Sequence, residues 1–312
     1  LSSSHIFNQY CSAKPIVACM FLAEAEAAGL RLDDRVADLL HNLTHFDSLT
    51  WAQVLNHSAG LNNPSSLEAH FLSSEEARDR ALTQIPSGLS SYSECGGMYI
   101  IIAAIEFLKG RRFSEITKER LRSAGLADAI FLNVDSYRLR EPMKHIGYSI
   151  RGLPQRAIPA YQDAAPHFGG VKRPALRVFA SSSGLVRFYG RVGKILAGEN
   201  VDGFPSTSYL SAALGRNRGP EFDETLRRTC DFAGGFMTSL TAHNFGVTIG
   251  SSAVGHSGLL GNSFGFVDPK TGYAYSAVLN GAAGNADDIE ILRPRLVRFL
   301  MDLGAACEQR HG

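Results

Sequence analysis

The first half of the chain is dominated by apolar positions with helical spacing. The stretch 12–30 is alanine-rich, almost wholly apolar at its start and closed by Gly29, which predicts a buried central helix. Thr50 is a suitable N-cap for a helix over 49–57. The same periodicity, together with helix start and stop residues, predicts further helices over 32–40, 97–109, 110–124 and 182–197.

From Phe232 onward the pattern changes to short β-type runs between Gly and Asn turns. These runs predict strands over 236–240, 245–249, 263–267 and 273–279, followed by a closing helix over 289–303. Helices followed by an antiparallel meander and a last helix predict an α+β fold, an α/β sandwich with a mostly antiparallel sheet.

Two segments lack a clear periodic pattern. Residues 133–175 are punctuated by Pro, Gly and Arg, and this region is predicted to supply the substrate-binding loops. The segment 200–230 is mixed in character and gives no prediction of its own.

Composition restricts the class of protein. The chain has 312 residues, of which 45% are hydrophobic and 20% charged, so one large domain or two closely packed lobes with a sizeable core are expected. A net charge of +1 gives no electrostatic basis for binding nucleic acid. No apolar run approaches the roughly 20 residues that span a bilayer, so no membrane span is expected.

The cysteines indicate neither a disulfide framework nor a zinc site, because they are odd in number, widely spaced and lack a Cys-x-x-Cys pair. They are Cys11, Cys19, Cys95, Cys230 and Cys307. A reducing, cytoplasmic setting is therefore predicted, with Cys19 and Cys95 as packing residues. His41 and His45 have i,i+4 spacing without an evident third ligand, so no metal is predicted. The chain begins at Leu1 rather than methionine, so a leader or longer N-terminal segment could precede it.

The segment Cys11-Ser12-Ala13-Lys14-Pro15 carries the first candidate chemistry. One helical turn places residues i and i+3 on the same face, so Cys11 and Lys14 are predicted neighbours. A helix start and a nearby ammonium lower a thiol pKa from its usual value of about 8.5. Cys11 is thus a candidate nucleophile, and Lys14 supplies the charge or takes the proton. Tyr92, in a Pro- and Gly-rich loop, is a candidate proton shuttle.

Each candidate also has a purely structural interpretation. Cys11 could be a small buried hydrophobe, which is the commonest fate of cysteine. The Tyr92 hydroxyl could cap a loop, Glu94 could be a solvated loop charge, and His256 could be a core histidine. Three ordered segments together favour the catalytic interpretation. They are 11–15, 92–94 and 255–263.

These segments read Cys-Ser-Ala-Lys-Pro, Tyr-Ser-Glu and Gly-His-Ser-Gly-Leu-Leu-Gly-Asn-Ser. Their order resembles that of the serine β-lactamase and penicillin-binding-protein superfamily, most of all its class C and family VIII esterase branch. In that superfamily the motifs are Ser-x-x-Lys, Tyr-x-Asn and Lys-Thr-Gly or His-x-Gly. Residues 55–61 and 180–188 also look like segments of that family, so the resemblance extends over nearly the whole chain.

The resemblance implies a β-lactamase/transpeptidase-like fold over 1–312 as a single domain. A helical lobe would cover roughly 30–180, and a sheet lobe would combine 1–30 with 230–312. It implies no cofactor. The implied site contains catalytic Cys11, Lys14 and Tyr92, an oxyanion hole from the backbone N–H groups of Cys11 and Leu259, and substrate contacts from Glu94, His256, Ser257 and Gly258.

The sequence departs from that family in three places. Cys11 stands where the family has its nucleophilic serine, and Glu94 stands where it has asparagine. Only ten residues precede Cys11, where the family has a helix and about two strands, and an isolated sheet without those strands would expose an edge.

Two further segments imitate catalytic motifs. Lys270-Thr271-Gly272 spells Lys-Thr-Gly, but Asp268-Pro269 just before it predicts a hairpin turn. Residues 261–265 match the Gly-x-Ser-x-Gly elbow of α/β-hydrolases. That elbow must enter a helix, and here a turn and a strand are predicted to follow.

The function expected from these observations is acyl transfer or amide formation on a small metabolite through a Cys11 thioester. A thiolate is a good nucleophile at neutral pH, and a thioester reacts readily with amines. The expected partners are a small-molecule acyl donor and acceptor, with a carrier-protein thioester as an alternative donor. Two alternatives stay open. One is an esterase or amidase whose Cys11 is either native or an engineered change from serine; the other is an inactive binding module.

Overall fold

The computed structural model describes residues 2–61, 74–93, 96–132, 146–148, 158–159, 178–258, 261, 263–279, 281–283 and 286–311. Its α-helices and 3₁₀ helices (η) are η1 (Tyr10–Ala13), α1 (Lys14–Ala27), α2 (Val36–Leu39), η2 (Thr44–Phe46), α3 (Trp51–Leu55), α5 (Ser74–Thr83), α6 (Gly96–Lys109), α7 (Phe113–Ser123), α8 (Ser182–Leu196), α9 (Thr207–Gly215), η4 (Leu240–His243) and α10 (Ala286–His311). Its strands are β1 (Phe7–Asn8), β2 (Ile130–Leu132), β3 (Ile146–Tyr148), β4 (Ile158–Pro159), β5 (Val178–Ala180), β6 (Glu221–Asp223), β7 (Arg228–Ala233), β8 (Phe236–Thr238), β9 (Val254–Ser257), β10 (Ser263–Asp268), β11 (Tyr273–Val278) and β12 (Gly281–Ala283).

The strands form a six-stranded antiparallel sheet in the order β11-β10-β9-β8-β7-β6 and two three-stranded sheets. One small sheet has the order β1-β5-β2, which brings the start of the chain beside residues far away in sequence. The other has the order β12-β3-β4, with β12 and β3 parallel. The predicted α+β class with a mostly antiparallel sheet is confirmed.

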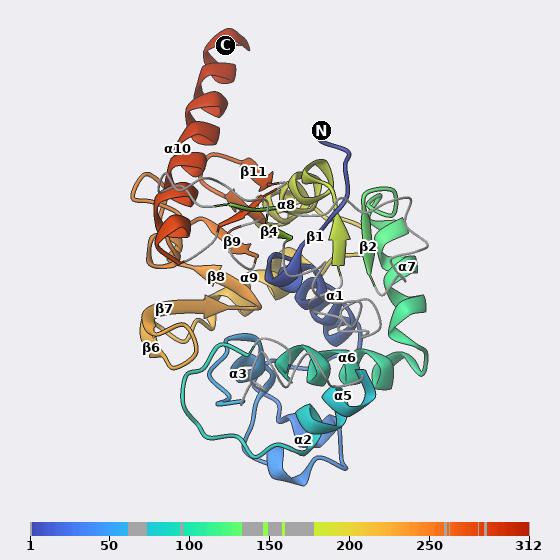
Figure 1. Ribbon diagram of the computed structural model, residues 1–312. Helices are drawn as coiled ribbons and strands as arrows, with labels where there is room; N and C mark the ends of the chain where they lie inside the picture. Colours follow the sequence, from blue (N-terminus) through green and yellow to red (C-terminus); the bar gives the residue numbers. More distant parts are fainter. Residues whose placement is uncertain are drawn as a thin grey trace.

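Helix α1 lies at the centre of the molecule (Figure 1). Helices α3, α5 and α6 gather on one side of it, and the six-stranded sheet with α8 lies on the other (Figure 1). All of its residues from Lys14 to Ala25 are buried, as the predicted central helix requires. The 3₁₀ turn η1 precedes it and contacts β9 and β10, so the start of α1 lies at the junction of helices and sheet.

Helix α8 packs directly on β10 and β11. Its close approach depends on Gly265, because a Cβ at this position would lie only 2.3 Å from the Tyr189 ring. Gly193 on the helix is required for the same reason, since a Cβ at this position would lie 2.9 Å from the Val267 side chain. Glycine at both positions allows helix and sheet to meet without a steric clash.

Most predicted helices are confirmed, with shifted ends. The Thr50 cap is present as a full capping box with Gln53 at the start of α3. The helix predicted from Gly110 begins at Phe113 instead, because Gly110 has a φ of +60° and Arg112 is extended. Helix α9, capped by the Ser206 side chain, lies in the segment whose pattern gave no prediction.

The strand predicted over 245–249 is wrong. The chain there follows η4, and Asn244 and Gly246 have φ values of +61° and +95°, which no extended strand accommodates. By contrast, the predicted hairpin at 268–272 is confirmed, because the Thr271 and Gly272 N–H groups both donate to the Asp268 carbonyl. Ser263 opens buried strand β10 rather than a helix, so residues 261–265 lack the geometry of a hydrolase elbow.

The predicted substrate-loop region 133–175 lies outside the described residues except for β3 and β4. Among the helices that the structure describes, none combines the length and apolar character needed to cross a membrane.

Candidate active site

Cys11 lies in a tight turn between β1 and α1. Tyr10 has a φ of +48°, which is rare for a bulky side chain, and its N–H donates to Asn8 Oδ1 at 3.1 Å. The helix predicted from Ser12 therefore begins as a 3₁₀ turn and becomes α-helical at Lys14. A strained residue directly before a candidate nucleophile fits the tendency of strained backbone to occur at functional sites.

The turn is fixed to the sheet by hydroxyl groups. The Ser12 hydroxyl donates to the Gln9 carbonyl at 2.6 Å and lies 2.9 Å from Ser263 Oγ on β10. Ser263 Oγ in turn donates to the same Gln9 carbonyl at 3.0 Å. Ser12 is fully buried and hydrogen-bonded, whereas Cys11 is only half-buried. Of these two neighbours, Cys11 is the side chain available for attack.

The structure brings the first two motifs together. Lys14 is fully buried, and its Nζ lies 4.7 Å from the centroid of the Tyr92 ring, in cation–π geometry. Cys11 packs against the buried cluster that includes Tyr92 and Phe264. The three predicted catalytic side chains therefore share one site, although 78 residues separate Lys14 from Tyr92.

The third motif lies on β9, next to η1. His256 is fully buried, its Nδ1–H donates to the Ser257 carbonyl at 2.9 Å, and its ring centroid lies 6.0 Å from that of Tyr92. Burial, and then the charge of Lys14, lower its pKa well below the ordinary value, so the ring is neutral at pH 7. A neutral ring can take up a proton but offers no charge to a substrate carboxylate.

Of the remaining predicted site residues, the structure describes Ser257 and Gly258. Ser257 is buried, with its hydroxyl directed at Met237 Sδ at 3.8 Å. The Gly258 N–H donates to the Ser263 carbonyl at 2.7 Å, which turns the chain back after the motif. Glu94 and Leu259 lie outside the described residues, so the Glu94 substrate contact and the second oxyanion N–H stay predictions.

His57 is a site residue that the sequence did not single out. It is buried, its Nδ1 accepts the Ser93 N–H at 3.1 Å, and its ring lies 4.6 Å from the Tyr92 ring. Burial, followed by the charges of Lys14 and nearby groups, lowers its pKa well below the ordinary value. The only available signal was its place in the segment 55–61, which looked like a family segment without chemistry.

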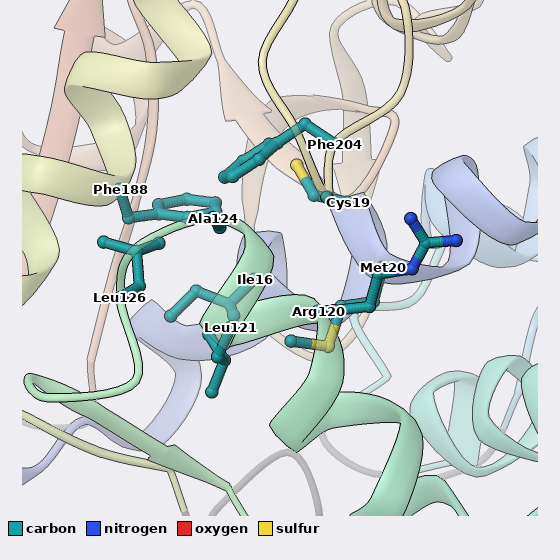
Figure 2. Close-up of a pocket in the computed structure, with 10 residues that line it drawn as sticks. Ile16, Cys19, Met20, Arg120, Leu121, Ala124, Leu126, Phe188 and Phe204 are labelled. Atoms are coloured by element: carbon teal, nitrogen blue, oxygen red, sulfur yellow. The ribbon is translucent and has the colours of Figure 1, made fainter.

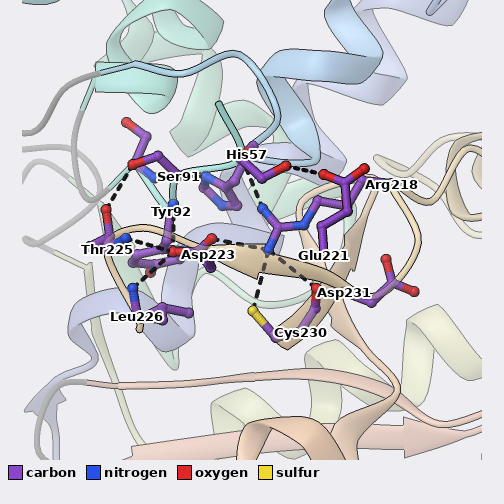
Figure 3. Close-up of polar contacts among 12 residues, drawn as sticks. His57, Ser91, Tyr92, Arg218, Glu221, Asp223, Thr225, Leu226, Cys230 and Asp231 are labelled. Atoms are coloured by element: carbon purple, nitrogen blue, oxygen red, sulfur yellow. Dashed lines mark hydrogen bonds and ion pairs between the residues drawn. The ribbon is translucent and has the colours of Figure 1, made fainter. Parts of the chain in front are cut away.

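A buried ion pair lies under the Tyr92 segment (Figure 3). Arg218 Nη2 lies 3.0 Å from Asp223 Oδ2, and the two side chains are 1% and 0% exposed. Asp223 Oδ1 accepts the Tyr92 N–H at 3.1 Å, and Arg218 Nη1 donates to the His57 carbonyl at 3.0 Å. Both residues come from the segment 200–230, where the pattern gave no prediction.

Three histidine rings surround Phe232 on β7. The centroid distances are 4.8 Å for His57, 4.9 Å for His243 and 6.3 Å for His256. The His243 Nε2–H donates to the Asp231 carbonyl at 2.8 Å. Burial, more than the nearby arginines, lowers the pKa of His243 from 6.5 to about 4. The site therefore contains neutral histidine rings close to the side chains of Lys14 and Arg218.

These histidines predict a loss of stability in acid. An unfolded His243 binds a proton below pH 6.5, whereas the folded residue resists protonation to about pH 4. The free energy of unfolding therefore falls as the pH drops through this window, by about 3 kcal/mol for this residue. The variant His243→Gln keeps an N–H for Asp231 and cannot titrate, so urea unfolding should show a correspondingly smaller acid loss.

The control is the exposed His41→Gln variant, which should leave the acid loss unchanged. Equal pH dependence in His243→Gln and the unaltered chain would contradict the prediction.

A separate small pocket borders α1 and is lined mostly by apolar side chains, which include Phe188 and Phe204 (Figure 2). Cys19 lines it, and burial raises the pKa of that thiol far above its ordinary value. Cys19 thus has the character of the predicted packing residue. Cys11, Lys14 and Tyr92 take no part in this pocket.

Comparison with known proteins identifies the class. The family model described as Beta-lactamase matches residues 2–297, so the chain belongs to the Beta-lactamase family. Family membership places it among the hydrolases and acyl-transferring enzymes of this fold. A curated relative, Penicillin-binding protein 4 of Amycolatopsis lactamdurans, is 26% identical over 317 residues, which cover 95% of this chain and 77% of that protein.

Two solved structures illustrate the shared fold. A family VIII carboxylesterase matches with a TM-score of 0.74 at 18% identity, over 96% of this chain and 84% of the other. EstCE1, described as a hydrolase with promiscuous acyltransferase activity, matches with a TM-score of 0.66 at 13% identity, over 95% of this chain and 85% of the other.

Proposed function

We propose that this protein is an acyl-transferring enzyme that works through a Cys11 acyl-thioester. The observation that carries the proposal is the position of Cys11. It is half-buried at the start of α1, beside a fully buried Lys14 whose Nζ lies 4.7 Å from the Tyr92 ring centroid. Ser12, the neighbouring hydroxyl, is buried and hydrogen-bonded, so it does not compete with the thiol.

The proposed reaction has two halves. In the first, a neutral Lys14 or a deprotonated Tyr92 takes the Cys11 proton, which passes to Tyr92 where Lys14 takes it first, and the sulfur attacks the acyl carbon of an ester or thioester donor. A C–S bond forms, the bond to the leaving group breaks, and Tyr92 delivers the proton to that group. In the second, an amine or alcohol attacks the thioester, the C–S bond breaks, and the thiol is restored by the acceptor's proton. The N–H groups of Cys11 and Leu259 are proposed to hold the oxyanion.

Thioester chemistry favours transfer over hydrolysis, because a thioester is more reactive toward amine nucleophiles than an oxygen ester is. The fold of EstCE1, a hydrolase with promiscuous acyltransferase activity, also supports this choice. The donor is proposed to be a small-molecule ester or thioester, or an acyl group on a carrier protein. Free thiols at Cys11, Cys19, Cys230 and Cys307 support a reducing compartment, for which we propose the cytoplasm.

Ester or amide hydrolysis is the second candidate function, and the family VIII carboxylesterase fold supports it. The variant Cys11→Ser distinguishes the two. If Cys11 is an engineered replacement of serine in an ordinary hydrolase, restoring serine raises turnover with water as acceptor. If the cysteine belongs to the mechanism, the same change lowers transfer to amines.

Intact-mass measurement tests the proposal directly. After incubation with p-nitrophenyl butyrate or a butyryl thioester, the protein should gain the mass of one butyryl group. The adduct should be absent from Cys11→Ala and should disappear faster with an added amine than in buffer alone. The matched control is Cys307→Ala, which removes an exposed thiol and should keep the adduct.

Two outcomes would overturn the proposal. One is an unaltered chain that forms no adduct with either donor. The other is an adduct that persists in Cys11→Ala. Either result would favour the alternative of an inactive binding module. That alternative is open because this chain lacks both the serine and the asparagine of the family motifs.

A further inference from the structure

The backbone around Tyr92 is held by three consecutive hydrogen bonds. The Ser91 N–H donates to the His57 carbonyl at 2.9 Å, the Tyr92 N–H donates to Asp223 Oδ1 at 3.1 Å, and the Ser93 N–H donates to His57 Nδ1 at 3.1 Å. One residue, His57, therefore accepts two of these three bonds. Its ring also lies 4.6 Å from the Tyr92 ring.

His57 is itself held firmly in this position. It follows α3 with a φ of +57°, a conformation that few side chains adopt and that persists only where the surroundings enforce it. Arg218 Nη1 donates to its carbonyl at 3.0 Å, and Phe232 packs against its ring at a centroid distance of 4.8 Å. Arg218 thus fixes the main chain of His57, and Phe232 packs against its ring.

The hydrogen bond from Ser93 also specifies the protonation state of the ring. Nδ1 can accept an N–H only if it carries no proton, so the proton of the neutral ring is on Nε2. Burial disfavours the charged ring, in agreement with its lowered pKa. A protonated ring would present an N–H to the Ser93 N–H and would break the contact.

We propose that His57 is a positioning residue for Tyr92, which it aligns with Cys11 and Lys14 by accepting the Ser93 N–H and packing against the phenol ring. The inference rests on the proposed role of Tyr92 as the proton carrier for the leaving group. It assigns His57 no contact with the substrate.

Two substitutions separate the Nδ1 acceptor from the rest of the side chain. His57→Asn places a carbonyl oxygen where Nδ1 is, and Asn tolerates a positive φ. His57→Phe keeps an aromatic ring and removes the acceptor. Should the Phe variant not fold, His57→Gln replaces it, because its amide reaches the position of Nε2 rather than that of Nδ1.

The readout is the rate of Cys11 acylation by two esters of the same acid. A p-nitrophenyl ester has a leaving group that needs no proton, whereas an ethyl ester expels an alkoxide that does. His57→Phe should slow acylation by the ethyl ester by about 10²-fold and acylation by the p-nitrophenyl ester only a few-fold. His57→Asn should restore most of the ethyl ester rate. A merely structural role would reduce both rates together.

Tyr92→Phe and the double variant complete the test. Tyr92→Phe should show the same selective loss, and adding His57→Phe to it should cost nothing further, because both changes act on one step. Suppose that Tyr92→Phe shows the selective loss. If His57→Phe then shows no loss, or an equal loss for both esters, the positioning role alone would be overturned. No selective loss in Tyr92→Phe would overturn the Tyr92 role and this inference with it, while Cys11 acylation of the unaltered chain would still stand.

Discussion

Replacing Lys14 by methionine is expected to lower the rate of Cys11 acylation by about 10²- to 10⁴-fold, the usual contribution of a positioned proton-transfer group. Lys14 is fully buried, and its Nζ faces the Tyr92 ring beside Cys11. Methionine is similar in length and fills the same space without a charge or a proton. The loss should therefore appear in acylation kinetics with a p-nitrophenyl ester and not in the folded fraction.

A matched control for this prediction is Lys194→Met. Lys194 is exposed on α8 and paired with Glu199 at 3.2 Å, so its loss should leave acylation unchanged. Circular dichroism and the urea midpoint should show that Lys14→Met remains folded. Acylation at the unaltered rate in a folded Lys14→Met protein would remove Lys14 from the mechanism.

The largest expected effect on stability comes from Arg218→Ala, which should lower the free energy of unfolding by about 3–5 kcal/mol. The Arg218 and Asp223 side chains are 1% and 0% exposed, so the substitution leaves the Asp223 carboxylate buried without its cation. It also removes the donor to the His57 carbonyl, which lies 161 residues away in sequence. Urea unfolding at pH 7 measures the change.

The matched control for the Arg218→Ala measurement is a substitution of Arg216, two residues earlier in the chain. Arg216 makes a bidentate ion pair with Asp33 at 2.9 and 2.7 Å, but these side chains are 37% and 51% exposed. Water screens such a pair, so Arg216→Ala should cost at most about 1 kcal/mol. Equal losses for the two variants would show that burial of the Arg218 pair adds nothing to stability.

Local sequence predicted those features whose physics is local. The Thr50 cap and the turn after Asp268 each involve groups three or four residues apart, and both appear as expected. The run at 245–249 shows the limit of this approach. Its apolar alternation favours a strand, yet the positive φ values of Asn244 and Gly246 turn the chain away from the sheet.

The candidate site divides in the same way. The order of motifs in the sequence predicted Cys11, Lys14 and Tyr92, and the structure places them in one site. It gave no indication of Arg218 or Asp223. Their role exists only because the chain returns to Tyr92 after more than a hundred residues, with an Asp223 oxygen against the Tyr92 N–H.

By itself, then, the sequence determined most of the helices, the turn chemistry after Asp268, the class of fold and the identity of the candidate nucleophile. The tertiary structure decided which side chains are accessible and which protonation states they hold. Cys11 precedes α1 and Cys19 lies within it, yet of these two thiols only Cys11 is partly exposed. Similarly, His41 is exposed, whereas His256 is buried and neutral. The reason is physical: desolvation and hydrogen bonding depend on which distant segments pack around a group, and no local pattern of residues specifies that packing.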